Sequence, residues 1–144
     1  MNRLVKVISS GFGLGYSPVA SGTVGSLLGI PLVWFYPNSL VMALLLIILG
    51  IWSSSQGEKL FGEKDSSKIV IDEVAGYYLA MLALPLTWPF FLSAFFLFRI
   101  LDVIKPGPIK RLQELKGGWG VVADDLAAGI LTNIILRIFY FIVY

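Results

Sequence analysis

The stretch Ile69-Val70-Ile71-Asp72-Glu73-Val74-Ala75-Gly76 marks the point where a polar segment of the chain becomes a long apolar run. Two adjacent carboxylates stand at this boundary. The arrangement returns in Val121-Val122-Ala123-Asp124-Asp125-Leu126-Ala127-Ala128-Gly129, where an acidic pair again follows a short apolar lead and precedes alanine and glycine. The repetition predicts two helices, each opened by an acidic pair.

Helix capping is the simplest explanation of an acid at a helix start, because Asp accepts hydrogen bonds from free N–H groups and opposes the positive end of the helix dipole. Capping accounts for one acid per helix, but not for two or for the repetition. Carboxylates in membrane helices are costly and usually serve a function. The pattern therefore favours a divalent-metal site between the two helix starts, with Asp72, Glu73, Asp124 and Asp125 as metal ligands.

The composition is that of a membrane protein. The 144 residues are 57% hydrophobic and only 14% charged, whereas soluble domains carry about 25% charged residues. The length suits one domain, so residues 1–144 are expected to form a single membrane-embedded domain. A net charge of +2 without a basic run gives no support for nucleic-acid binding.

Apolar runs and turn signals divide the chain into helices. The runs are 24–36, 40–52, 74–101 and 126–144. Pro37-Asn38-Ser39 predicts a first helical hairpin, and Pro85-Leu86-Thr87-Trp88-Pro89 predicts a turn that makes the third run a second hairpin rather than one kinked helix. The expected fold is all-α: a multihelical integral membrane protein with two helical hairpins, a C-terminal transmembrane helix and loops on the cytoplasmic face.

The basic residues support this topology. Nine of the eleven Lys and Arg residues fall in segments assigned to one side of the membrane, and the two opposite turns carry none. The exceptions, Arg99 and Arg137, lie inside apolar runs. By the positive-inside rule, the side that carries these nine basic residues is cytoplasmic. Every acidic residue falls on that side too, so the site is expected to face the cytoplasm.

A glycine-rich stretch on the same side could bind phosphate. Residues 11–26 contain five glycines and lead into a predicted helix capped by Ser21 or Thr23. Free N–H groups at a helix start bind anions, and Ser21, Thr23 and Ser26 would add hydroxyl groups. The alternative explanation is a plain turn followed by close helix packing through glycine.

Arg99, Asp102 and Lys105 follow one another at three-residue spacing, so they share a helix face. The two cations would bind phosphoryl oxygens beside Asp102. A simple ion pair within the helix is the alternative explanation for Arg99 and Asp102.

The absence of His and Cys restricts the chemistry. All-oxygen ligands suit Mg²⁺ and argue against zinc or copper. A thiolate or phosphohistidine intermediate is excluded, and no Asp-x-Asp motif supports an aspartyl phosphate. What remains is attack by a metal-activated water, with a carboxylate as base. The candidate catalytic residues are Asp72, Glu73, Asp102, Asp124 and Asp125.

Four motifs, Ser21–Ser26, Ile71–Gly76, Phe98–Pro106 and Asp124–Gly129, together resemble the phosphatidylglycerophosphatase A family in content and order. The resemblance implies a Mg²⁺-dependent enzyme of the bacterial inner membrane. Such an enzyme hydrolyses the terminal phosphomonoester of phosphatidylglycerophosphate, a phospholipid in the bilayer, to phosphatidylglycerol and phosphate.

Two other classes of protein stay open. One is a different membrane phosphotransfer enzyme, such as a CDP-alcohol phosphotransferase, although the Asp-Gly-x-x-Ala-Arg signature of that group is absent. The other is a divalent-cation carrier, whose acids are expected in the middle of membrane helices rather than at their ends.

Overall fold

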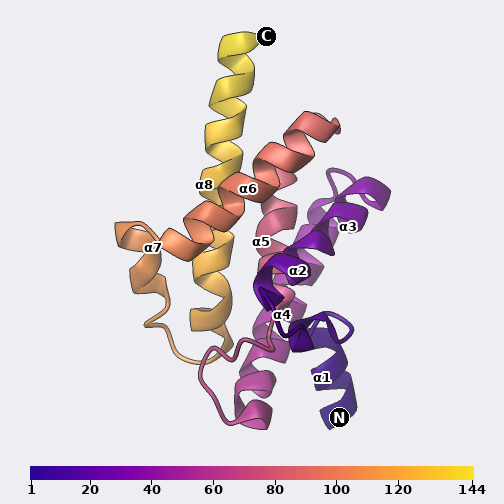
Figure 1. Cartoon of the computed structure of the whole chain (residues 1–144), viewed down its shortest axis with the longest axis vertical. Helices are drawn as coiled ribbons and strands as arrows, with labels where there is room; N and C mark the ends of the chain where they lie inside the picture. The colour runs from indigo at the N-terminus through magenta and orange to yellow at the C-terminus, as the bar shows by residue number, and fades with distance from the viewer.

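The computed structural model describes all 144 residues and contains helices and no strands (Figure 1). The prediction of an all-α fold is confirmed. The elements are α1 (Asn2–Ser9), a 3₁₀ turn (Leu14–Tyr16), α2 (Ser21–Leu27), α3 (Gly29–Phe35), α4 (Leu40–Phe61), α5 (Ile71–Met81), α6 (Trp88–Ile104), α7 (Gly107–Leu112) and α8 (Gly118–Val143).

Helix α5, opened by the first acidic pair, is the centre of the fold. It packs against α2, α3, α4, α6 and α8, and nine of its 11 residues are buried. At ~1.5 Å per residue it is about 16 Å long, roughly half the thickness of a bilayer core. A short helix that is buried on nearly all sides is stable only when other helices surround it.

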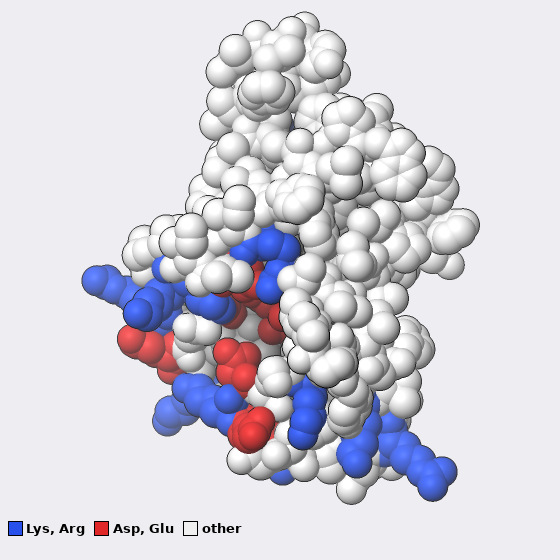
Figure 2. All heavy atoms as spheres, in the orientation of Figure 1, with Lys and Arg blue, Asp and Glu red and all other residues white.

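Helices α4 and α8 are the two elements long and apolar enough to cross a membrane. Large apolar side chains are exposed along both, including Ile48 (62%) and Ile130 (51%). Charged side chains gather on the lower half of the face in Figure 2, while the upper half is free of them. An uncharged surface of this kind suits lipid rather than water, which indicates a membrane protein.

The apolar run 74–101, predicted to form the second hairpin, is divided between two helices, α5 and α6. The chain leaves the helical conformation between Met81 and Trp88, so residues 74–101 are not one kinked helix. Pro89 lies in the first turn of α6, where a missing N–H group costs little because the first turn has no intrahelical partners. In Figure 1, α6 then crosses obliquely in front of α8.

The apolar run 24–36 differs from its prediction, because it is divided at Leu28 into α2 and α3. Pro31 cannot donate a hydrogen bond to the carbonyl of Leu27, which favours a break at this place. Both short helices pack on α5.

The helix predicted from the apolar run 40–52 is longer than that run, because α4 continues to Phe61. Ser53, Ser54 and Gly57 are buried. Their small side chains let neighbouring segments approach the lower half of α4, and the polar face beyond them reaches water.

The two turns at the far end from the charged residues lie side by side. The Asn38 side-chain oxygen accepts a hydrogen bond from the Ala83 N–H group at 2.7 Å. The hydroxyl of Tyr78, on α5, donates to the Tyr36 carbonyl at 2.5 Å. These contacts join the turn after α3 and the turn after α5 at one end of the molecule.

Arg137, the basic residue of the last helix, has a structural partner. Its Nη2 donates to the Leu82 carbonyl at 3.2 Å, and Asn133 donates to the same carbonyl at 2.8 Å and to the Ala80 carbonyl at 3.0 Å. These are carbonyl groups at the end of α5, which have no intrahelical donor. A cation there also opposes the negative end of the helix dipole.

Candidate active site

The acidic pairs meet where α5 crosses α8. A Cβ added to Gly129 would collide with the Gly76 carbonyl, and one added to Gly76 would lie 2.7 Å from the Asp125 carbonyl. Only glycine allows this approach of two backbones. Each glycine follows an acid by four residues, Gly76 after Asp72 and Gly129 after Asp125, so each shares a helix face with that acid.

The carboxylates at this crossing are withdrawn from solvent. Asp72 is 4% exposed, Asp102 is 7% exposed, and Asp124 and Asp125 are each 2% exposed. Glu73 is half-buried beside them, with 14% of its side chain exposed. Burial of so many carboxylates is unfavourable unless cations compensate them.

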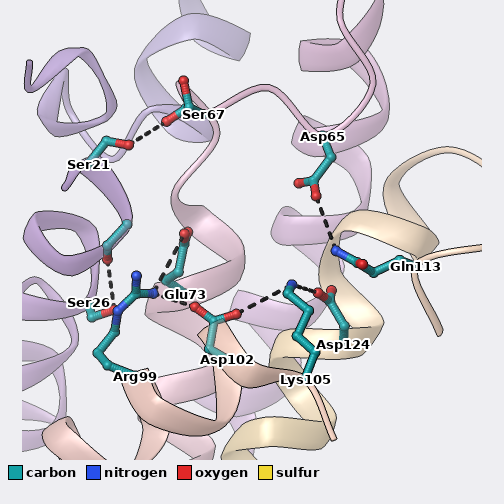
Figure 3. A network of polar contacts seen from close by, with 11 residues as sticks. Ser21, Ser26, Asp65, Ser67, Glu73, Arg99, Asp102, Lys105, Gln113 and Asp124 are labelled. Carbon is teal, nitrogen blue, oxygen red and sulfur yellow. Dashed lines mark hydrogen bonds and ion pairs between the residues drawn. The ribbon is translucent and has the colours of Figure 1, made fainter. Parts of the chain in front are cut away.

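Two cations near the end of α6 compensate part of this charge. Figure 3 shows a chain of alternating charges that runs from α5 through α6 to α8. Arg99 lies 4.0 Å from Glu73 and pairs with Asp102; Lys105 lies 3.6 Å from Asp102 and pairs with Asp124. The simple intrahelical pair proposed for Arg99 and Asp102 is present, but it forms part of this longer chain.

Two carboxylates of this cluster, Asp72 and Asp125, have no cationic partner. Buried side-chain oxygens of four acids also form no hydrogen bond within the protein: Asp72 Oδ1, Glu73 Oε2, Asp124 Oδ1 and Asp125 Oδ1. Buried polar atoms are nearly always satisfied in folded proteins. These oxygens are therefore suited to a ligand that the protein binds here.

The carboxylates form two groups with metal-binding spacing. In one group, oxygens of Asp72, Glu73 and Asp125 lie within 4.8 Å of one another; in the other, those of Asp102, Asp124 and Asp125 do. Asp125 belongs to both. Lys105 contacts two members of the second group, whereas the first group has one cationic contact, Arg99 at 4.0 Å from Glu73.

Capping does not explain the acids. Neither α5 nor α8 has a side-chain cap hydrogen bond at its start. Asp72 and Glu73 do stand in the first turn of α5. The prediction that Asp124 and Asp125 open the last helix is wrong, because α8 begins at Gly118 and the pair lies well inside it.

The glycine-rich segment reaches the site through Gly22. A Cβ at this position would collide with Glu73 Oε1 and would lie 3.2 Å from both terminal nitrogens of Arg99. The predicted cap is absent, because α2 begins at Ser21 without a side-chain cap. Ser21 donates to the Ser67 carbonyl at 2.8 Å and Ser26 to the Gly22 carbonyl at 2.8 Å, whereas Thr23 is half-buried on the same short helix.

Lys105 occupies the end of α6 with a left-handed backbone, at φ 49°. Burial lowers the pKa of its ammonium group, but the hydrogen bond to Asp124 and the charges of Asp124, Asp125 and Asp102 outweigh burial and raise the pKa above its ordinary value. The group is therefore protonated at neutral pH, as a phosphate-binding group must be.

Asp65, on the segment before α5, escaped the sequence analysis because it stands among other charged residues. Desolvation and the negative charges of Asp72 and Asp124 raise its pKa to about 6. Its carboxylate lies 3.5 Å from the Gln113 side-chain nitrogen (Figure 3). In the sequence, Asp65 stands only seven residues before Asp72, and this proximity to the first acidic pair could have indicated that it lies near the site.

Known proteins resemble the chain along most of its length. The phosphatidylglycerophosphatase A family matches residues 7–140. Phosphatidylglycerophosphatase A of Escherichia coli is 38% identical over 94% of the chain and 81% of its own length, and that of Haemophilus influenzae is 34% identical over 92% and 86%. A Bacteroides thetaiotaomicron protein, provisionally named a phosphatidylinositol-3-phosphatase, is 36% identical over 92% and 91%. No solved structure matches the chain.

These matches place the chain in a class of enzymes, the phospholipid phosphatases. More particularly, it belongs to the phosphatidylglycerophosphatase A family. The family predicted from four separated motifs is confirmed, and with it the prediction of a phosphoric monoester hydrolase.

Proposed function

We propose that the chain releases the terminal phosphate of phosphatidylglycerophosphate, giving phosphatidylglycerol and inorganic phosphate, in a Mg²⁺-dependent reaction at the acidic cluster. Membership of the family supports the phosphatase activity. The observation that carries the metal dependence is the set of buried carboxylate oxygens without partners, contributed by two helices that cross at glycine.

Asp72, Glu73 and Asp125 are the residues that we expect to hold Mg²⁺, with Asp124 beside them. Three clustered carboxylates offer the hard oxygen ligands that this ion prefers. When bound, Mg²⁺ would supply Lewis-acid activation of the phosphoryl group and of the water that attacks it.

The remaining residues bind the phosphate and move the proton. Arg99 and Lys105 place positive charge beside the cluster, where they neutralise phosphoryl oxygens as charge develops on them. Asp102 pairs with both cations and holds them in position. A carboxylate of the cluster accepts the proton that the attacking water loses.

The test of this function is phosphate release by the purified protein. Phosphatidylglycerophosphate, phosphatidic acid and phosphatidylinositol 3-phosphate are compared, each with Mg²⁺ and with a chelator. The third lipid is included because of the name of the Bacteroides relative. We expect Mg²⁺-dependent turnover that is greatest for phosphatidylglycerophosphate. Turnover that survives chelation would refute the metal dependence, and preference for another lipid would refute the substrate.

The proposal also places the protein in the bacterial inner membrane, with several crossings and the site facing the cytoplasm. The family relatives are bacterial, and nine of the eleven basic residues fall in segments assigned to one side of the membrane, the side of the acidic residues. Single cysteines test the orientation, because the chain has none of its own. In inside-out vesicles, Lys64→Cys should react with an impermeant maleimide and Thr87→Cys should not. The reverse labelling would show that the protein has the opposite orientation in the membrane.

A further inference from the structure

An apolar groove of about 450 Å³ lies between α7 and α8. Pro106 and Ile109 form one wall, and Ala127, Ile130 and Ile134 form the other. No charged residue lines it. Ile130 and Ile134 are 51% and 48% exposed although they stand on a helix that could cross a membrane.

The near end of this groove adjoins the active site. Pro106 directly follows Lys105, whose ammonium group pairs with Asp124. Ala127 stands three residues after Asp124, so it lies on the same face of α8, one turn along the helix. A molecule in the groove would therefore have one end beside the cation that we expect to bind phosphate.

The groove extends along α8 from Ala127 to Ile134, which is seven residues or about 10 Å along the helix axis. Asp124 and Ile134 are ten residues apart in one helix, which corresponds to about 15 Å along its axis. The hydrocarbon core of a bilayer is about 30 Å thick, so each leaflet contributes about half of this. The distance from Asp124 to the far end of the groove therefore matches an acyl chain that begins at the headgroup level and ends near the middle of the bilayer.

We infer that this groove holds one acyl chain of the phospholipid substrate while the phosphate lies at Lys105. The inference rests on the proposed function. An acyl chain has no polar group to satisfy, which suits walls without hydrogen-bonding side chains. The charge at the near end is complementary to an anionic headgroup, and this favours a phospholipid over the apolar helix of a second protein.

The experiment fills the groove and compares substrates that differ only in chain length. Ile130→Trp and Ile134→Trp are assayed with dioleoyl and dihexanoyl phosphatidylglycerophosphate. We expect KM for the long-chain lipid to rise about tenfold, a loss equivalent to fewer than two buried methylene groups. KM for the short-chain lipid should change less than about twofold, and this arm also reports whether each variant is folded. Ile48→Trp, on the exposed face of α4, is the matched control and should behave as wild type.

Three results would overturn the inference. Equal effects on the two substrates would show that the groove does not distinguish acyl chains, and so would the absence of any effect. A change in oligomeric state with unchanged chain-length preference would show that the groove binds a second protein.

A labelling experiment separates the groove from the proposed reaction. Phosphatidylglycerophosphate with a diazirine in one acyl chain should label α7 and the segment 127–134 of α8 in wild type, and this labelling should be lost in Ile130→Trp. Labelling without turnover would refute the proposed function and support the groove. Turnover with labelling elsewhere would refute the groove alone.

Discussion

The acidic pairs of α5 and α8 look alike in sequence but occupy different places in their helices. Asp72 and Glu73 stand in the first turn of α5, where free N–H groups and the helix dipole favour negative charge. Asp124 and Asp125 lie well inside α8, far from any helix end. Asp124 pairs with Lys105, which comes from α6, whereas Asp125 has no cationic partner.

What the two pairs share is the glycine that follows. Gly76 and Gly129 stand four residues after Asp72 and Asp125, and they bring the two backbones together. The comparison teaches that the acids are placed by a helix crossing and not by helix starts. The following variants test this interpretation, beginning with the largest expected effect.

Asp125→Asn should reduce kcat/KM by about 10³-fold or more, because it removes a carboxylate common to both metal-binding groups. Asp72→Asn should have a similar effect, since both pairs serve one site. Calorimetry should show loss of Mg²⁺ binding in both variants. Glu114→Gln, on an exposed segment, is the control and should retain activity. Full activity in Asp125→Asn would mean that the α8 pair serves only as a partner for Lys105.

Lys105→Ala should reduce activity by about 10²-fold, because it removes positive charge from the phosphate site and leaves Asp124 buried without its cation. The comparison is sharpened by Lys110→Ala, an exposed basic residue of α7 that should cost little. Steady-state kinetics on both variants measure the two losses of activity. Equal losses of activity in the two variants would show that Lys105 has no specific role in phosphate binding.

Gly129→Ala should lower activity by roughly ten- to a hundredfold, because the new methyl group forces α8 away from the Gly76 carbonyl and displaces the acids from one another. Overpacking of this kind also costs ~1–3 kcal/mol of stability, which a thermal melt would detect. Gly50→Ala is the matched control, since its Cβ would meet only Val122, at 3.5 Å. If Gly129→Ala were as active as wild type, the close crossing of α5 and α8 would not be needed to position the acidic residues.

Asp65→Asn should weaken Mg²⁺ affinity by only about threefold, and only at higher pH. The raised pKa of about 6 means that Asp65 is neutral, like Asn, at pH 5 and charged at pH 7.5. The groups that act on it are Asp72, Asp124, Glu58 and Lys105. Calorimetric titrations at the two pH values should therefore differ between wild type and variant at pH 7.5 and agree at pH 5. A difference that persists at pH 5 would contradict a charge effect.

The sequence was sufficient for the features that depend on residue type and local pattern. The start of α5, the break near Pro85 and the meeting of Asp72 with Asp125 all follow from polarity, proline and the repeated acidic pair. The turns at Asn38 and Ala83 meet at the end opposite to the charged residues, as the distribution of Lys and Arg indicates.

The sequence was misleading where glycine and serine serve packing rather than turns. Gly118 opens α8, where an added Cβ would collide with the Ile51 carbonyl, and its N–H group donates to the Ser55 hydroxyl at 2.7 Å. Glycine is therefore needed for contact between α8 and α4. Such contacts join distant segments, so no local pattern reveals them, and the same is true of Gly22 at the site.

The contact of Arg137 with the end of α5 has a consequence for how the protein is assembled. A charged side chain within the bilayer costs ~2.5–3.5 kcal/mol on the scale of helix insertion, and α8 carries this charge until it meets the Leu82 carbonyl. Helix α5 is itself too short to span the bilayer alone. Each of the two helices thus supplies what the other lacks, so α8, which is synthesised after α5, completes the insertion of the earlier helix.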